Sequence, residues 1–389
     1  MRLITKPKIK PLRPEFSSGP CAKRPGWDIQ KIVKSAYLGR SHRATGPKSQ
    51  IQKVIRLTKE TLEIPEHYRV AVVPASNTGA FEMAMWTMLG KCPVDILAWE
   101  NFGLIWANDI IEELQLEDYH LISADYGLFP NLTTIREQSD ICFTWNGTTS
   151  GVRVPDANWI SSKREGLVLC DATSAVFSQK VDWAKLDVTS FSWQKAMGGE
   201  AAHGVLVLSP KAIERLENFT PDRPLPKIFR LVKNGKLING IFTGETVNTP
   251  SMFCVSDALD ALHWIKELGG QTATIERANA NFKILQGWLD QQCWVENLVS
   301  EEDYRSNTSV CLKIVAEEFL RLAPDQQQQF VTQFVSLLEL EGVAFDIGGH
   351  REAPPGLRIW CGPTIEEKDL HDLLPWLNWA FETVKVTFF

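Results

Sequence analysis

The chain has 389 residues, of which 44% are hydrophobic and 23% charged, and its formal net charge is −6. These values exclude a disordered chain and allow two domains with a substantial core. The acidic balance argues against nucleic acid and anionic membranes as partners. No apolar run approaches the roughly 20 residues that a transmembrane helix needs.

The first thirteen residues include five basic and no acidic ones. They lack the apolar core of a signal peptide, and Pro7 and Pro11 interrupt any amphipathic transit helix. We therefore expect residues 1–15 to form an ordered or semi-ordered arm. The eight cysteines are scattered without a CxxC pair, which favours a reducing cytoplasm and suggests neither disulfides nor a metal site.

Short apolar runs alternate with helical patterns up to about residue 265. Strands are predicted at 70–74, 95–99, 141–145, 167–170, 188–192 and 204–208, and helices at 80–89 and 104–114. This rhythm is typical of βαβ units and predicts an α/β fold with a mostly parallel sheet covered by helices. Ligands of such sheets bind at the carboxyl ends of the strands. We expect residues 16–265 to form this large domain.

The pattern changes after residue 265. A long helix over 271–288 is followed by strand segments, a helix over 325–340 and a final helix over 365–384. This order predicts a second, smaller α+β domain over residues 266–389. No internal repeat or low-complexity linker separates the two domains.

Two charged residues near predicted strand ends are candidates for acid–base and Schiff-base chemistry. Asp171 follows the mostly apolar run 166–170, and Lys195 lies 24 positions later in a loop before the next strand. A carboxylate can keep a pyridine nitrogen protonated and a lysine amine can form a Schiff base, as a pyridoxal 5′-phosphate (PLP) enzyme requires. Alone, Asp171 can equally serve a salt bridge or a cap, and lysines in glycine-rich loops are usually solvated.

Two polar segments are candidates for holding a phosphate. One, between a predicted strand and helix, consists of Ser76, Asn77, Thr78 and Gly79. Free N–H groups at a helix N-terminus favour an anion, but the same residue types also cap ordinary helices. The second segment contains Asn248 and Thr249. These residues could cap the following helix, or they could donate hydrogen bonds to a phosphate in a neighbouring subunit.

Two His–Arg pairs stand out in this acidic chain. They are His42-Arg43 and His350-Arg351, and Arg358 follows the second pair. Arginine binds carboxylates and phosphates through two parallel hydrogen bonds, so these residues would suit a substrate with both groups. The alternative is scattered surface charge. The pair occurs twice among seven histidines, beside glycine or serine, which favours a site.

Taken in order, these motifs resemble the phosphoserine aminotransferases, in the class V branch of the fold-type I PLP enzymes. Residues 16–20 (FSSGP) are similar to the start of that family, and the resemblance covers roughly residues 14–380. Its most specific parts are the His–Arg pairs. It implies a mostly parallel seven-stranded sheet in the large domain, PLP as the cofactor, and a homodimer with shared active sites.

The resemblance also implies roles for individual residues. Lys195 resembles the Schiff-base lysine, Asp171 the partner of the pyridine nitrogen and Thr148 the partner of the ring hydroxyl. The implied phosphate ligands of the cofactor are Gln194, the segment Ser76 to Gly79, and Asn248 and Thr249 of the partner subunit. Arg358 would anchor the α-carboxylate. The substrate phosphate would be surrounded by His42, Arg43, His350 and Arg351, some of them from the other subunit.

Two positions depart from the family pattern. Many members stack a tryptophan on the cofactor ring, and here Phe102 is the matching candidate. Many also have an arginine in the phosphate segment, where this chain has Thr78. These departures indicate a divergent subgroup.

The predicted reaction exchanges an amino group between glutamate and 3-phosphohydroxypyruvate, which gives 3-phosphoserine and 2-oxoglutarate for serine biosynthesis. Other class V reactions are alternatives. One is serine–glyoxylate transamination, which does not need the His–Arg pairs, and another is cysteine desulfuration, which needs a mobile cysteine such as Cys361. A non-catalytic, phospho-ligand-binding relic of the fold is the last alternative.

Overall fold

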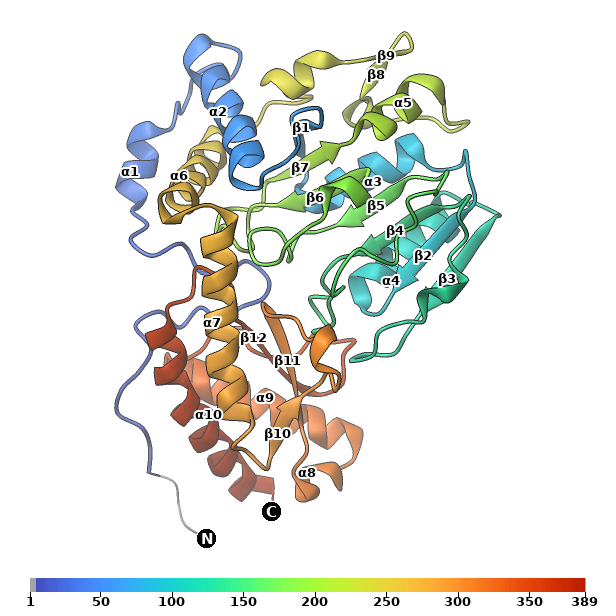
Figure 1. Cartoon of the computed structure of the whole chain (residues 1–389). Coiled ribbons are helices and arrows are strands. Elements are labelled where there is room, and N and C mark those ends of the chain that lie inside the picture. Colours follow the sequence, from blue (N-terminus) through green and yellow to red (C-terminus); the bar gives the residue numbers. More distant parts are fainter. Residues whose placement is uncertain (1–4, 389) are drawn as a thin grey trace.

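The computed structural model describes residues 5–388 and is built around a seven-stranded sheet with the strand order β1-β7-β6-β5-β4-β2-β3 (Figure 1). β7 is antiparallel to its neighbours β1 and β6, whereas the other neighbouring strands are parallel. The mostly parallel α/β sheet is therefore confirmed. The strands are β1 (Arg69–Pro74), β2 (Val94–Ala98), β3 (Tyr119–Ser123), β4 (Asp140–Thr144), β5 (Val168–Asp171), β6 (Val188–Ser192) and β7 (His203–Leu208).

Helices cover both faces of this sheet. On one face, side chains of α2 and α6 pack against alternate strand residues such as Val70 and Val205. On the other face, α3 packs against the intervening residues, for example Ala71 and Leu206. Burial on both sides explains why strands such as β1 and β7 consist largely of apolar residues. The helices of this part are α1 (Ile29–Ser35), α2 (Thr45–Thr61), α3 (Ser76–Met88), α4 (Asn101–Asn108), α5 (Pro210–Asn218) and α6 (Met252–Leu268).

Two local differences from the predicted elements have simple causes. The strand β3 was not predicted, because it lies at the sheet edge and only Ile122 in it is buried. The predicted helix 104–114 is α4 followed by a π-helical segment, Asp109–Glu113. The change from α-helical to π-helical backbone hydrogen bonds occurs within one continuous apolar pattern, so the sequence does not reveal it.

The C-terminal part has its own core around an antiparallel sheet of β10 (Val295–Asn297), β11 (Ser309–Ile314) and β12 (Gly356–Trp360). Helices pack on it: α7 (Gln271–Leu289), α8 (Glu317–Leu320), α9 (Pro324–Leu340) and α10 (Glu367–Phe388). A two-stranded sheet, β8 (Val232–Lys233) and β9 (Lys236–Leu237), lies next to α5. Among the described residues, no helix combines the length and apolar character that crossing a membrane requires.

The described part of the N-terminal arm lies against the C-terminal part, as Figure 1 shows. The backbone oxygen of Ile9 accepts a hydrogen bond of 2.6 Å from Trp376, and Lys6 pairs with Glu341 at 2.6 Å. Residues 1–4 of the predicted arm lie outside the described residues. The domain limits at residues 15 and 265 stay predictions, and residue 265 lies inside α6.

His203 joins the sheet to α6 through a buried imidazole. Its Nε2 accepts a hydrogen bond of 3.2 Å from the backbone N–H of Ser251, the residue that caps α6. Burial lowers the pKa of His203 to about 4. The folded imidazole therefore resists protonation, whereas the unfolded one takes up a proton near its ordinary pKa of about 6.5.

This difference predicts that stability falls as the pH is lowered from about 6.5 to 4, with the full loss present below pH 4. The contribution of His203 is ~3 kcal/mol. In His203→Gln the amide oxygen can replace Nε2 as acceptor without titrating, so this variant should lose ~3 kcal/mol less across the window. Urea unfolding of both proteins at pH 6.5 and pH 4 measures the difference, and equal losses would contradict the assignment.

Candidate active site

The carboxyl ends of β4, β5 and β6 surround a cavity of about 230 Å³. Most of the cofactor residues expected from the sequence line it: Ser76, Asn77, Thr78, Phe102, Thr148, Asp171, Gln194 and Lys195. Gly79 lies directly behind them, in the first turn of α3. The cavity is thus where chemistry is expected in an open, mostly parallel sheet.

Asp171 is the last residue of β5, and its carboxylate is buried. Oδ1 accepts hydrogen bonds from the N–H and hydroxyl of Thr173, at 3.0 and 2.6 Å, and Oδ2 accepts one from Trp106 Nε1 at 3.2 Å. Burial raises the pKa of Asp171, and these hydrogen bonds and the charge of Lys195 oppose the rise. A cationic group against the carboxylate would lower its pKa further.

Lys195 lies in the turn after β6, and its side chain is also buried. Its Nζ donates a hydrogen bond to the backbone oxygen of Ser18 and lies 5.9 Å from the centre of the Trp360 ring. Burial lowers the pKa of the amine, and the nearby charge of Arg358 adds to this effect, while Asp171 opposes it. A lowered pKa favours the neutral amine, which is the nucleophilic and basic form.

The segment from Ser76 to Gly79 is the first turn of α3, rather than a loop before the helix as expected. Ala75 is the N-cap, with a φ of 65°, and no side chain caps the helix. The tight strand-to-helix turn starts the helix earlier than its apolar pattern indicates. Because no side chain caps these N–H groups, the turn can accept an anion.

The opposite wall of the cavity comes from α4 and from the loop after β4. Phe102 and Trp106 lie one turn apart on α4, and 37% of the Phe102 surface is exposed. Thr148 donates a hydrogen bond of 2.8 Å from its hydroxyl to Ser174. A planar ring can therefore be held between Phe102 and the sheet.

His42, Arg43, Asn248 and Thr249 do not line this cavity in their own chain. His42 and Arg43 line a separate cavity of about 380 Å³ with Gly244, Glu245 and Thr246, and Asn248 and Thr249 are exposed shortly after that segment. The 42–48 and 243–249 segments are joined by a Lys48–Glu245 ion pair of 2.9 Å. The structure thus brings both segments to one surface away from Lys195.

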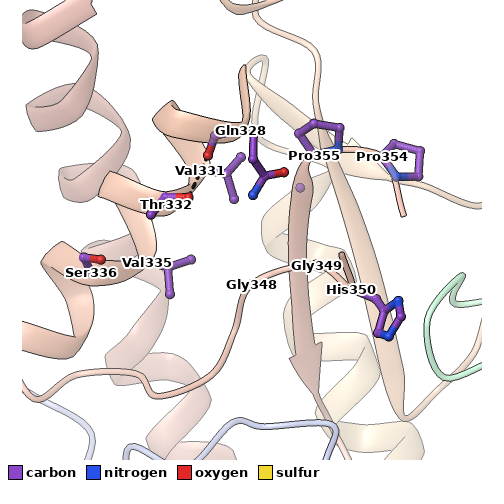
Figure 2. Close-up of a pocket in the computed structure, with 11 residues that line it drawn as sticks. Gln328, Val331, Thr332, Val335, Ser336, Gly348, Gly349, His350, Pro354 and Pro355 are labelled. Carbon is purple, nitrogen blue, oxygen red and sulfur yellow. Dashed lines mark hydrogen bonds between the residues drawn. The ribbon is translucent and has the colours of Figure 1, made fainter. Parts of the chain in front are cut away.

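His350 and Arg351 lie on the Gly348–Gly356 segment, across a cavity of about 180 Å³ from α9. In Figure 2 the His350 ring points away from the α9 side chains. The centre of the His350 ring lies 6.4 Å from the centre of the Phe102 ring. Phe102 lines the cavity that contains Lys195, so His350 lies at the edge of that cavity. The nearest carboxylate to Arg351 is the exposed Glu352, at 3.4 Å.

Arg358, on β12, is half-buried, and its Nε is buried without a hydrogen-bond partner among the described residues. Burial lowers the pKa of both Lys195 and His350, and the charge of Arg358 adds to this effect. A buried N–H of a guanidinium group that has no hydrogen-bond partner is destabilising. Arg358 is therefore suited to a carboxylate ligand.

Three contacts at the site were not expected from the sequence. Trp106 donates to Asp171, Thr173 donates twice to it, and Ser18 accepts from Lys195. Trp106 follows Phe102 by four residues, so the two lie on the same face of a helix. This spacing could have indicated that Trp106 also lies at the site. Nothing local to Ser18 signals its contact with a residue 177 positions away.

A model of the aminotransferase class-V family matches residues 126–331, more than half of the chain. A phosphoserine aminotransferase of Methanosarcina mazei is 48% identical over 380 residues, which cover 98% of this chain and 100% of the relative. The chain therefore belongs to the class-V aminotransferases and, within them, to the phosphoserine aminotransferase family.

Solved structures agree on the fold. A phosphoserine aminotransferase from Cytophaga hutchinsonii superposes with a TM-score of 0.79 at 20% identity and covers 93% of this chain and 97% of its own. A PLP-bound phosphoserine aminotransferase from Trichomonas vaginalis has a TM-score of 0.76 at 16% identity, with coverages of 94% and 99%. The fold is thus shared by distant sequences.

The turn before α3 depends on Gly79. A Cβ at this position would lie 2.4 Å from the backbone oxygen of Pro74. We expect Gly79→Ala to lower the free energy of unfolding by ~2 kcal/mol, because backbone must shift to admit the methyl group. Gly287→Ala, where a Cβ would meet nothing within 4 Å on an exposed face of α7, should instead raise it by up to ~1 kcal/mol. Urea unfolding of the two variants measures both changes.

Proposed function

We propose that the protein is a PLP-dependent transaminase that interconverts 3-phosphohydroxypyruvate and glutamate with 3-phosphoserine and 2-oxoglutarate. The observation that carries this proposal is the cavity in which a buried carboxylate, Asp171, and a buried amine, Lys195, lie at the ends of neighbouring strands. The close relationship to a protein named phosphoserine aminotransferase supports the choice of substrates.

The lining residues fit PLP by their chemistry. The side-chain oxygens of Asn77 and Gln194 are buried without a hydrogen-bond partner among the described residues; either amide, rotated, would offer N–H groups to a phosphate. These amides and the first turn of α3 would hold the phosphate, and Asp171 the ring nitrogen. Thr148 would hold the ring hydroxyl and Phe102 one ring face. When bound, PLP supplies an electron-accepting ring that stabilises negative charge at the substrate's α-carbon.

The protein groups perform the proton transfers. The Lys195 amine, with its lowered pKa, would take the proton from the substrate's α-carbon and hold it on Nζ. The Asp171 carboxylate would keep a proton on the ring nitrogen, and the hydrogen bonds that it accepts from Thr173 and Trp106 fix it in place. Arg358 binds the α-carboxylate and orients the α-carbon.

We also propose a homodimer in which each subunit completes the other's site. His42 and Arg43 lie near the segment that leads to Asn248 and Thr249. All four were expected near a phosphate, yet none lines the cavity of its own chain. If the surface that carries these four residues docks at the partner's cavity, all four reach that cavity together, opposite His350 and Arg351.

The alternatives are less well supported. Cys361 is fully buried, with its Sγ near the backbone oxygen of Ile359 at 3.9 Å, which does not suit the mobile nucleophile of a desulfurase. Serine–glyoxylate transamination would leave the His–Arg pairs without a ligand. A non-catalytic relic would not need the lowered pKa of Lys195. The cytoplasmic location stays a prediction from the sequence.

The assignment of Lys195 is tested by reconstituting the purified protein with PLP. We expect a visible absorbance band from the lysine-bound cofactor, and borohydride reduction with peptide mass spectrometry should place PLP on Lys195. The band should be lost in Lys195→Ala and kept in Lys180→Ala, which removes an exposed lysine. A band that persists in Lys195→Ala would show that another residue binds the cofactor.

The phosphate ligands are tested with Arg43→Ala and Arg351→Ala. Each should lower kcat/KM for phosphoserine roughly 100-fold, because charge-assisted hydrogen bonds to phosphate are lost, while PLP absorbance remains. Activity on serine, which lacks the phosphate, should change little. Equal losses on both substrates, or none, would refute the phosphate role and favour the serine–glyoxylate alternative.

The dimer is tested by mixing two inactive variants. If Arg43 acts in the partner's site, refolding Arg43→Ala with Lys195→Ala gives mixed dimers with one intact site, and about a quarter of wild-type activity returns. Mixing Arg358→Ala with Lys195→Ala is the control, because both residues serve the same chain's site and no intact site forms. Failure of the first mixture to recover activity would place Arg43 elsewhere.

A further inference from the structure

Glu100 is a buried carboxylate at the back of the cavity wall. It is the N-cap of α4 and only 1% exposed. Oε1 accepts a hydrogen bond of 2.8 Å from the N–H of Gly103. Oε2 points the other way and accepts hydrogen bonds from the N–H and hydroxyl of Thr149, at 3.2 and 2.8 Å. The carboxylate thus joins the start of α4 to the loop after β4.

The loop is shaped around this side chain. A Cβ on Gly147 would lie 2.6 Å from Oγ of Ser150, 2.8 Å from Cγ of Glu100 and 2.9 Å from Nε1 of Trp99, so glycine is needed where these three side chains meet. Thr149 also accepts a hydrogen bond of 3.2 Å from the N–H of Asn101. Simple capping of α4 would need neither the contact with Thr149 nor the space beside Gly147.

The two segments that Glu100 joins carry facing residues of the cavity. Phe102 follows Glu100 by two positions, and Thr148 immediately precedes Thr149, and both line the cavity. Burial raises the pKa of Glu100 to about 7, and nearby Asp171 adds to the rise. A buried carboxylate of this kind is destabilising unless its hydrogen bonds offset the loss of hydration.

We propose that Glu100 is a positioning residue, which sets Phe102 and Thr148 at a fixed separation across the cofactor cavity. Glu100 does not line the cavity and acts through Gly103 and Thr149. The inference rests on the proposed function in that the cavity must hold PLP. It adds to the site a residue that neither the sequence motifs nor the cavity lining had indicated.

The test measures PLP affinity and the circular dichroism of the bound cofactor. In Glu100→Gln one carboxylate oxygen becomes an amide NH₂, which cannot accept a hydrogen bond from the backbone N–H that it faces, so the N–H of either Gly103 or Thr149 loses its acceptor. We expect the dissociation constant for PLP to rise about tenfold, with a smaller dichroism signal because the ring is less fixed. Glu112→Gln, at an exposed site in the segment after α4, should match the wild type.

Variants of Thr149 test the same link from its other end. Thr149→Val removes the hydroxyl and should weaken PLP binding and dichroism like Glu100→Gln, whereas Thr149→Ser keeps the hydroxyl and should restore both to within about twofold. The double variant should be little worse than either single one, because both break one connection.

The outcomes separate this inference from the proposed function. Wild-type affinity and dichroism in Glu100→Gln and Thr149→Val would overturn the positioning role while leaving PLP binding intact. Additive losses in the double variant would also contradict it. If the wild-type protein binds no PLP, the proposed function fails instead.

Discussion

A buried carboxyl group and a buried amine at the ends of neighbouring strands determine the chemistry of the site. Asp171 ends β5, and Lys195 follows β6, its parallel neighbour. Neither is stable in an apolar interior without partners. Thr173 and Trp106 supply hydrogen bonds to the acid, and the backbone of Ser18 supplies an acceptor to the amine. The architecture therefore keeps both groups in the core and leaves a cavity between them.

The sheet could be predicted because both of its faces are covered. Strands such as β5 and β7 are fully buried, and each contains an apolar run, residues 168–170 in β5 and 205–208 in β7. The edge strand β3 has one buried residue and lacks this signal. The start of α3 was missed because it depends on a left-handed turn at Ala75, which its residue type does not indicate.

The site was predictable to the extent that its residues have distinctive chemistry. Asp171 and Lys195 follow apolar strands, and the structure brings them to one cavity. Glu100 was not singled out, because a glutamate before a helix is common and its burial depends on Gly147 and Thr149, which are more than 40 positions away. Tertiary contacts of this kind cannot be inferred from local pattern.

The arginines expected at the substrate phosphate differ from the buried acid and amine in how they are held. Arg351 pairs with Glu352 at the surface, where an ion pair contributes little and is easily exchanged. Arg43 is exposed beside His42. Weakly held guanidinium groups at a rim can transfer to an incoming phosphate with little loss of existing interactions. Arg358, in contrast, is already partly desolvated on β12, so it is suited to a fixed carboxylate that both substrates share. Under the proposed function, this division would let one site accept a phosphorylated substrate and glutamate in turn.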